Sequence, residues 1–65
     1  MRTNAQRVLI AEDHRLIAEA FKQILETDYQ VVGTVGDGRA MVRLALELRP
    51  DLVVVDIAMA TSSRY

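Results

Sequence analysis

The chain has no cysteine and no tryptophan, and its 65 residues include one proline, one phenylalanine and one histidine. Without cysteine no disulfide bond can form, and a single histidine without cysteine partners cannot build a structural zinc site. A domain this short buries only about 60% of the surface that its unfolded chain exposes. We therefore expect the folded chain to need further support, which self-association would supply.

Charge and hydrophobic length exclude two further classes of function. Eight basic and nine acidic residues are interspersed, with a net charge of −1 and no basic block, which argues against nucleic-acid binding by this chain. No apolar run approaches the length of a membrane span, and Glu12 comes too early for a signal peptide. We expect one domain without linkers or repeats, in a soluble cytoplasmic protein that does not bind membranes.

The most informative stretch is the apolar run from Leu52 to Asp56, LVVVD. Three consecutive β-branched valines without polar alternation predict a strand that is buried on both faces. Pro50 excludes a helix that continues into this run. The predicted strand ends at Asp56, and its carboxylate is therefore expected at the rim of the sheet.

A second apolar run shows the same arrangement at the start of the chain. Arg7 to Ala11, RVLIA, predicts a strand that ends at the acidic pair Glu12 and Asp13. Tyr29 to Val35, YQVVGTV, predicts another strand, in which a glycine is a weak point. The sequence thus predicts three strands, two of which deliver carboxylates to their ends.

The segments between these strands repeat apolar residues at helical spacing. In the first helix, which Asp13 or His14 should cap and Thr27 and Asp28 should end, the expected apolar face consists of Leu16, Ile17, Ala20, Phe21, Ile24 and Leu25. In the second helix, Arg39 to Arg49, the expected face consists of Met41, Leu44, Ala45 and Leu48. Asp37, within the turn GDG, is the expected N-cap of the second helix.

The order strand-helix-strand-helix-strand predicts an α/β domain with a parallel sheet. The two most apolar strands, the first and the third, both favour central positions. The order 2-1-3 puts the first strand in the middle and, with right-handed crossovers, sends the helices to opposite faces. The carboxyl ends of the first and third strands then border a crevice. Glu12, Asp13 and Asp56 are expected to point into it.

Three carboxylates at one rim repel one another, by about 4 kcal/mol for two charges 4 Å apart at an effective dielectric near 20. Such a site should either keep a proton or bind a cation. Mg²⁺ accepts one or two carboxylates, a backbone carbonyl and several waters. A carboxylate beside Mg²⁺ is also a nucleophile toward phosphorus, so the pattern suggests transfer of a phosphoryl group onto Asp56.

Residues 7–59 resemble the N-terminal half of a bacterial two-component response-regulator receiver domain, of the branch commonly joined to a helix-turn-helix output domain. The matching segments are RVLIAEDH, RLIAEAFKQIL and VVGTVGDGRAMVRLALELRPDLVVVDIAM. The resemblance implies a flavodoxin-like fold and a phosphorelay signalling module that is not an enzyme. It implies Asp56 as phosphoacceptor, a Mg²⁺ site made of Glu12, Asp13, Asp56 and the backbone carbonyl of Ala58, and a histidine kinase as phosphodonor.

The chain also departs from the pattern of that family. A complete receiver has five strands, with a hydroxyl residue on the fourth and a lysine on the fifth, whereas the lysine here, Lys22, falls in the middle of the first predicted helix. Residues 60–65, ATSSRY, match nothing in the pattern, and Thr61 to Ser63 are not expected to replace the missing hydroxyl. We therefore interpret 1–65 as one truncated receiver domain in which phosphotransfer is impaired.

A bare outer edge on the third strand would pair with another chain. We expect apolar surface around Val53, Val55, Leu44 and Phe21, and a homodimer formed by antiparallel pairing of third strands or by exchange of elements. A phosphorylation-independent interaction fragment is therefore the alternative function. A half flavodoxin that binds flavin is disfavoured, because the acidic pair after the first strand would repel a phosphate. His14 is expected to be exposed on the first helical turn, without a role as a ligand or base.

Overall fold

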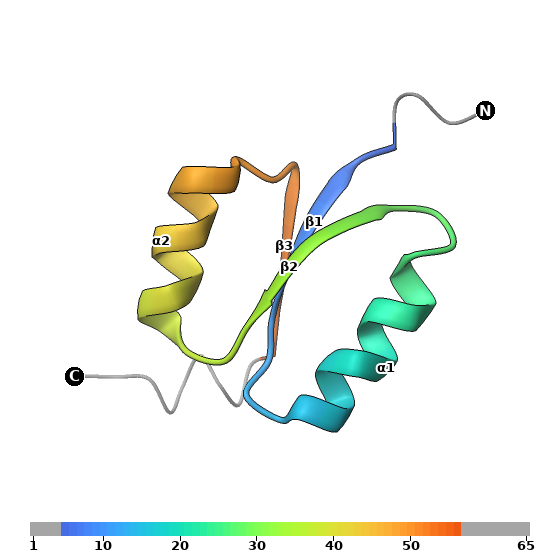
Figure 1. The fold of residues 1–65 in the computed structure, drawn as a ribbon, viewed down its shortest axis with the longest axis horizontal. Helices are drawn as coiled ribbons and strands as arrows, with labels where there is room; N and C mark the ends of the chain where they lie inside the picture. Colours follow the sequence, from blue (N-terminus) through green and yellow to red (C-terminus); the bar gives the residue numbers. More distant parts are fainter. Residues whose placement is uncertain (1–4, 57–65) are drawn as a thin grey trace.

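The computed structural model describes residues 5–56, in which strands and helices alternate (Figure 1). The elements are β1 (Arg7–Ala11), α1 (Arg15–Leu25), β2 (Gln30–Val35), α2 (Gly38–Leu48) and β3 (Leu52–Val55). Each lies within two residues of the segment that the sequence predicts. Neither α1 nor α2, the helices of the described residues, has the length and hydrophobicity of a membrane-spanning segment.

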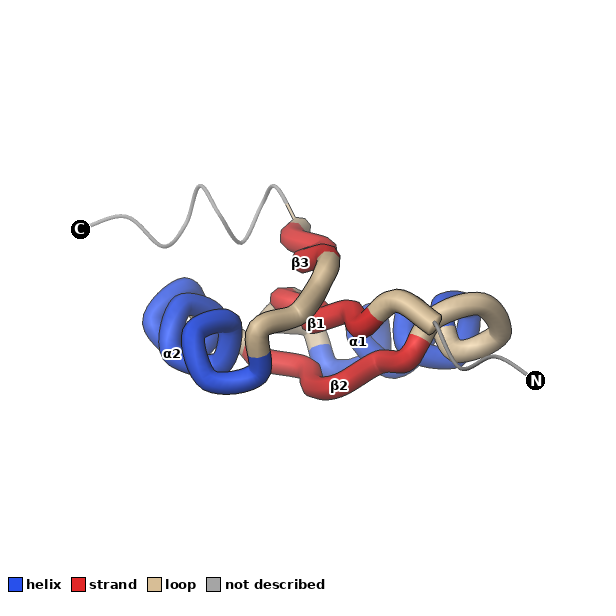
Figure 2. Tube along the Cα trace, turned by 90° about the horizontal axis from the view of Figure 1, so that it is seen from above, coloured by secondary structure: helices blue, strands red, loops and turns tan. Residues whose placement is uncertain are grey.

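The three strands form a parallel sheet in the order β2-β1-β3, which confirms the predicted flavodoxin-like topology. Figure 2 shows α1 and α2 on opposite sides of the sheet, as right-handed crossovers require for this order. The β1–β2 register shifts after Val8, so that Val8 pairs with Val31 and Leu9 pairs with Gly33. This irregularity lies next to the glycine that was predicted to weaken the second strand.

The core is built around β1, whose Val8, Leu9, Ile10 and Ala11 are almost completely buried. Leu9 and Ala11 form a cluster with Val35, against which the inner face of α2 packs with Ala40, Met41, Leu44 and Ala45. Side chains alternate between the faces of a strand, so Val8 and Ile10 lie on the face that α1 covers. A central strand covered by both helices explains the uninterrupted apolar run of β1.

The same explanation fails for β3, and the prediction that its valine run is buried on both faces is wrong. Leu52, Val53 and Val55 keep 42%, 41% and 36% of their surface exposed. β3 pairs with β1 along one edge, while both helices pack against β1 and β2, and Figure 2 shows β3 projecting beyond the layer that holds the helices. The expected apolar surface is thus present at Val53 and Val55, whereas Leu44 and Phe21 are half-buried.

The buried face of α1 also differs from the predicted stripe. Ala18 is the buried residue of this helix, and four members of the predicted face, Leu16, Ile17, Ala20 and Ile24, are exposed. An apolar stripe indicates which side chains of a helix can be buried. The area of the sheet surface beside the helix determines how many of them are buried. Only β1 and β2 make substantial contact with α1, and the small side chain of Ala18 faces them.

Candidate functional site

The acidic pair that follows β1 is held where the strand joins α1. The backbone N–H of Glu12 donates to the carbonyl of Val35 at 2.9 Å, which extends the pairing with β2 by one residue. This bond keeps Glu12 inside the fold, where its side chain is 2% exposed. Asp13 follows it to the surface, with its side chain 44% exposed. One carboxylate of the pair is therefore buried and the other is accessible.

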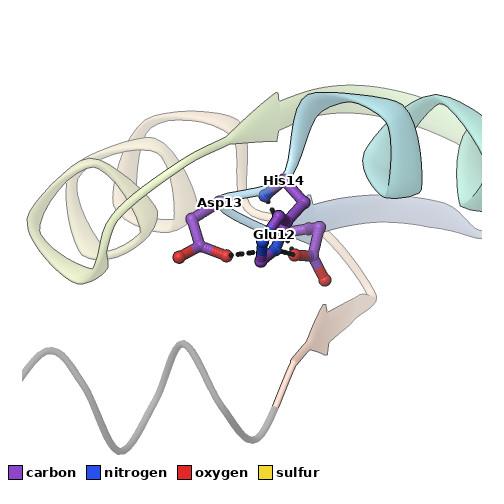
Figure 3. Close-up of polar contacts among 3 residues, drawn as sticks. All are labelled: Glu12, Asp13 and His14. Carbon is purple, nitrogen blue, oxygen red and sulfur yellow. Dashed lines mark hydrogen bonds and ion pairs between the residues drawn. The ribbon is translucent and has the colours of Figure 1, made fainter.

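His14 links these two carboxylates (Figure 3). Its ring Nδ1 lies 3.3 Å from Oε2 of Glu12 and 3.2 Å from Oδ1 of Asp13. Its backbone N–H also donates to Oε2 of Glu12 at 3.0 Å. The buried carboxylate of Glu12 thus has hydrogen-bond donors at the very start of α1, which offsets part of the cost of removing its charge from water.

His14 occupies the N-cap position of α1, but its side chain makes no capping hydrogen bond. The expectation that Asp13 or His14 caps this helix is confirmed for the position of His14 but not for a capping hydrogen bond. The ring of His14 contacts the carboxylates of Glu12 and Asp13 instead. The second expected cap is confirmed, since the carboxylate of Asp37 accepts the N–H of Ala40 at 2.8 Å. The two helices therefore begin differently, and only α1 begins at a cluster of titratable side chains.

Asp56 lies at the end of β3, beside the end of β1. Its backbone N–H donates to the carbonyl of Ala11 at 3.2 Å, one residue before Glu12. This bond confirms that the carboxyl ends of the two strands are neighbours, as the strand order requires. Ala58 lies outside the residues that the structure describes, as does the segment 60–65.

Three side chains gather at this end of the sheet with atoms suited to bind a metal ion. One ligand atom from each of Glu12, Asp13 and His14 lies within 4.8 Å of the other two. In the part of the chain that the structure describes, the carboxylate of Asp56 is not a member of this group. The structure therefore joins two of the predicted ligands, adds one that the sequence interpretation left out, and places Asp56 on the adjacent strand.

The donor set fits a divalent cation. Carboxylate oxygens are the protein ligands that Mg²⁺ prefers, and a buried carboxylate gains most from a nearby positive charge. A pocket of about 520 Å³ adjoins the group on the side of β2 and leaves room for bound waters, with Glu12, Asp13, Arg15, Glu19, Thr34 and Gly36 among its lining residues. Mg²⁺ usually keeps several waters, so an open pocket beside the carboxylates suits it.

The interaction of His14 with the acidic pair is the feature that sequence reasoning missed. The ring is 69% exposed, as expected for the first turn of α1, but exposure does not prevent it from touching both carboxylates. The available signal was the direct succession Glu-Asp-His after a buried strand. Three consecutive residues at a strand end are close enough for their polar atoms to meet, although side-chain rotation decides whether they do.

Comparison with known proteins gives one consistent result. Residues 8–63 match the family model described as the response regulator receiver domain. The chain is 39% identical over 59 residues to the transcriptional regulatory protein YdfI of Bacillus subtilis, covering 88% of this chain and 28% of that protein. It is 47% identical over 55 residues to the transcriptional regulatory protein PdtaR of Mycobacterium tuberculosis, covering 83% of this chain and 27% of that protein.

A relative of a different kind shares the same segment. A protein-glutamate methylesterase/protein-glutamine glutaminase of Syntrophomonas wolfei is 49% identical over 55 residues, covering 82% of this chain and 16% of that protein. No solved structure gives a significant match. The chain spans less than a third of the length of each of these three relatives. A parallel β2-β1-β3 sheet, an acidic pair after β1, an aspartate after β3 and the match over residues 8–63 together show that the chain belongs to the response regulator receiver domain family.

Proposed function

We propose that this chain is a phosphoryl-accepting signalling module of a two-component phosphorelay, with Asp56 as the phosphoacceptor. The observation that carries the proposal is the hydrogen bond from the backbone of Asp56 to Ala11, because it sets the end of β3 against the strand end that carries Glu12 and Asp13. A single rim then supplies both a nucleophilic carboxylate and carboxylates that attract a cation. A histidine kinase is the proposed donor and the cytoplasm the proposed location.

In the proposed reaction a carboxylate oxygen of Asp56 attacks phosphorus and forms a new P–O bond. The bond between phosphorus and the donor atom breaks, its electron pair leaves with the donor, and Asp56 becomes an aspartyl phosphate. Glu12, Asp13, Asp56 and the carbonyl of Ala58 are the proposed holders of Mg²⁺. When bound, this ion would neutralise charge on the phosphoryl oxygens.

Phosphotransfer by the 65-residue chain on its own should be slow. The family implies a hydroxyl residue on a fourth strand and a lysine on a fifth, and both would contact the phosphoryl group. Lys22 cannot replace that lysine, because it lies in the last turn of α1. We propose that the chain itself is a switch and not an enzyme. One relative is named a methylesterase and glutaminase, but the chain matches only 16% of the length of that protein.

A direct test treats the purified chain with a small acyl phosphate and records the intact mass over time. The proposal predicts a slow gain of one phosphoryl group that requires Mg²⁺ and stops when the metal is chelated. Asp56→Asn should abolish the gain, whereas Asp51→Asn, at the start of β3, should leave it unchanged. A gain that persists in Asp56→Asn would reject Asp56 as the acceptor.

We propose a second function on a separate observation, the exposure of Leu52, Val53 and Val55 on β3. A flat apolar edge strand offers unpaired backbone groups to another strand, so two chains can join their sheets through antiparallel pairing of β3. This association needs no phosphate. A test separates the two proposals: the Asp56→Asn variant should lose phosphorylation but keep the dimerisation equilibrium of the parent chain.

A further inference from the structure

The position of the His14 ring is not explained by helix capping or by packing. Its side chain makes no capping hydrogen bond, and 69% of it is exposed. Nevertheless Nδ1 lies at nearly equal distances, 3.3 Å and 3.2 Å, from one oxygen of Glu12 and one oxygen of Asp13. The ring therefore extends the acidic pair into a set of two oxygens and one nitrogen (Figure 3).

These distances match the spacing of atoms that share one metal ion. Bonds of about 2.0–2.2 Å from a metal to oxygen or imidazole nitrogen place neighbouring ligand atoms about 3 Å apart. All three atoms lie within 4.8 Å of one another, so only small side-chain rotations separate the observed arrangement from a common coordination sphere. His14 and Asp13 are exposed enough to make such rotations, whereas the oxygen of Glu12 is fixed by the backbone N–H of His14.

Imidazole changes which ions the site favours. Carboxylates and waters suit Mg²⁺, while imidazole suits later transition metals, whose affinity for mixed nitrogen and oxygen sites rises from Mn²⁺ to Ni²⁺ and Cu²⁺. We infer that His14 is a third side-chain ligand beside Glu12 and Asp13, and that it makes this site bind Ni²⁺-like transition ions in preference to Mg²⁺. The inference rests on the proposed cation site and specifies which ions that site selects.

The test compares equilibrium binding of Mg²⁺ and Ni²⁺, measured by calorimetry on the whole chain. In His14→Ala the affinity for Ni²⁺ should fall by at least about tenfold, since even supporting groups around a metal contribute about 10- to 100-fold. The affinity for Mg²⁺ should change by less than about twofold, because oxygen ligands dominate its binding. Arg43→Ala, at an exposed position of α2 that does not line the pocket beside this site, is the control and should preserve the preference for Ni²⁺.

Two outcomes would overturn the inference. If both affinities fall by the same factor, His14 only supports the fold of the site. If both rise, the ring occupies the place of the ion and competes with it. Circular dichroism of each variant checks that the helices remain.

A second measurement needs no variant. The chain contains one histidine, so its ring protons give unambiguous NMR signals. Binding of Ni²⁺ should broaden or shift these signals first, and unchanged ring signals at saturating Ni²⁺ would reject His14 as a ligand. Phosphorylation of Asp56 in the presence of Mg²⁺ separates this failure from failure of the proposed function. If Asp56 is phosphorylated but the ring signals of His14 do not respond to Ni²⁺, only the ligand role of His14 is rejected.

Discussion

At the scale of single residues, the amino end of the sheet is held together by Arg7. Its Nη1 donates to the carbonyl of Leu48 and, at 3.1 Å, to the carbonyl of Arg49 at the end of α2. Its backbone N–H donates to the carboxylate of Asp51 at 2.7 Å, and Asp51 N–H returns a bond to the Arg7 carbonyl at 2.8 Å. One residue thus ties β1 to the helix end and to the start of β3.

Removing this side chain should destabilise the fold. Arg7→Ala deletes two hydrogen bonds from a charged group to helix-terminal carbonyls, and we expect the free energy of unfolding to fall by about 1–2 kcal/mol. Arg7→Lys keeps the charge with fewer directed donors and should lose less. Urea denaturation measures both variants, and an Arg7→Ala midpoint equal to that of the parent would contradict the role given to Arg7.

Among the non-glycine residues that the structure describes, Arg49 has a positive φ, at 50° with ψ 60°. A side chain in this left-handed conformation costs roughly 1–2 kcal/mol, and glycine avoids most of that cost. Arg49→Gly should therefore raise the free energy of unfolding by about 0.5–1 kcal/mol after the greater freedom of glycine in the unfolded chain is deducted.

The matched control for Arg49→Gly is Arg43→Gly, inside α2 at an exposed position with helical geometry. That change should lower the free energy of unfolding by about 1 kcal/mol. Thermal unfolding of both variants gives opposite shifts if the conformation of Arg49 is strained. Equal losses of stability in both would show that it is not.

At the same scale, the sequence predicts that Glu12 and Asp13 lie together, because adjacency and the end of a buried strand require it. The bridge through His14 could not be predicted in the same way. Whether an exposed ring turns toward its neighbours depends on side-chain rotation, which the residue order leaves open. The positive φ of Arg49 could not be predicted either, because arginine has no preference for the left-handed conformation.

At the scale of elements, the two helices show what a local pattern predicts well. α2 begins at Asp37, where the turn Gly-Asp-Gly supplies a capping carboxylate, and its inner face contains the predicted Met41, Leu44 and Ala45. In α1 the apolar spacing correctly predicts a helix, but most of the predicted apolar face is exposed, because burial depends on the surface that β1 and β2 provide. Period is a local property of the sequence, and burial is a property of the assembled sheet.

The cap of α2 can be tested directly. Asp37→Ala removes the acceptor for the N–H of Ala40 and should lower the free energy of unfolding by about 1 kcal/mol. Asp37→Asn retains a capping oxygen and should stay within a few tenths of a kcal/mol of the parent. Chemical denaturation distinguishes the two, and equal losses in both variants would mean that the charge of Asp37, not its hydrogen bond, stabilises the helix.

At the scale of the whole molecule, the topology followed from the sequence through general rules. Three apolar strands separated by two helices, right-handed crossovers and a central place for β1 leave few alternatives, and the order β2-β1-β3 is confirmed. The exposure of β3 could not be deduced from LVVVD, because a run of valines has the same composition whether its outer edge is covered or bare. Coverage depends on elements outside the run itself.

The exposed strand leads to a prediction about assembly. We expect sedimentation of the chain to show a concentration-dependent dimer, because β3 offers an apolar edge to a second copy. Val53→Lys should shift this equilibrium toward monomer by placing a charge on that edge. Leu46→Lys on α2 is the control and should leave the dimer unchanged, because Leu46 is 74% exposed and lies on a different element. Equal dissociation of both variants would place the interface elsewhere.

The measurement that tests the central claim most directly is chemical mapping of the phosphorylated residue. An aspartyl phosphate is reduced by borohydride to homoserine, which mass spectrometry locates within the chain. After incubation with an acyl phosphate and Mg²⁺, the account predicts homoserine at Asp56 and unmodified Glu12 and Asp13. Homoserine at Asp13, or no reduced residue in a chain shown to bind Mg²⁺, would contradict a site in which the carboxylate after β3 accepts the phosphoryl group and those after β1 hold the cation.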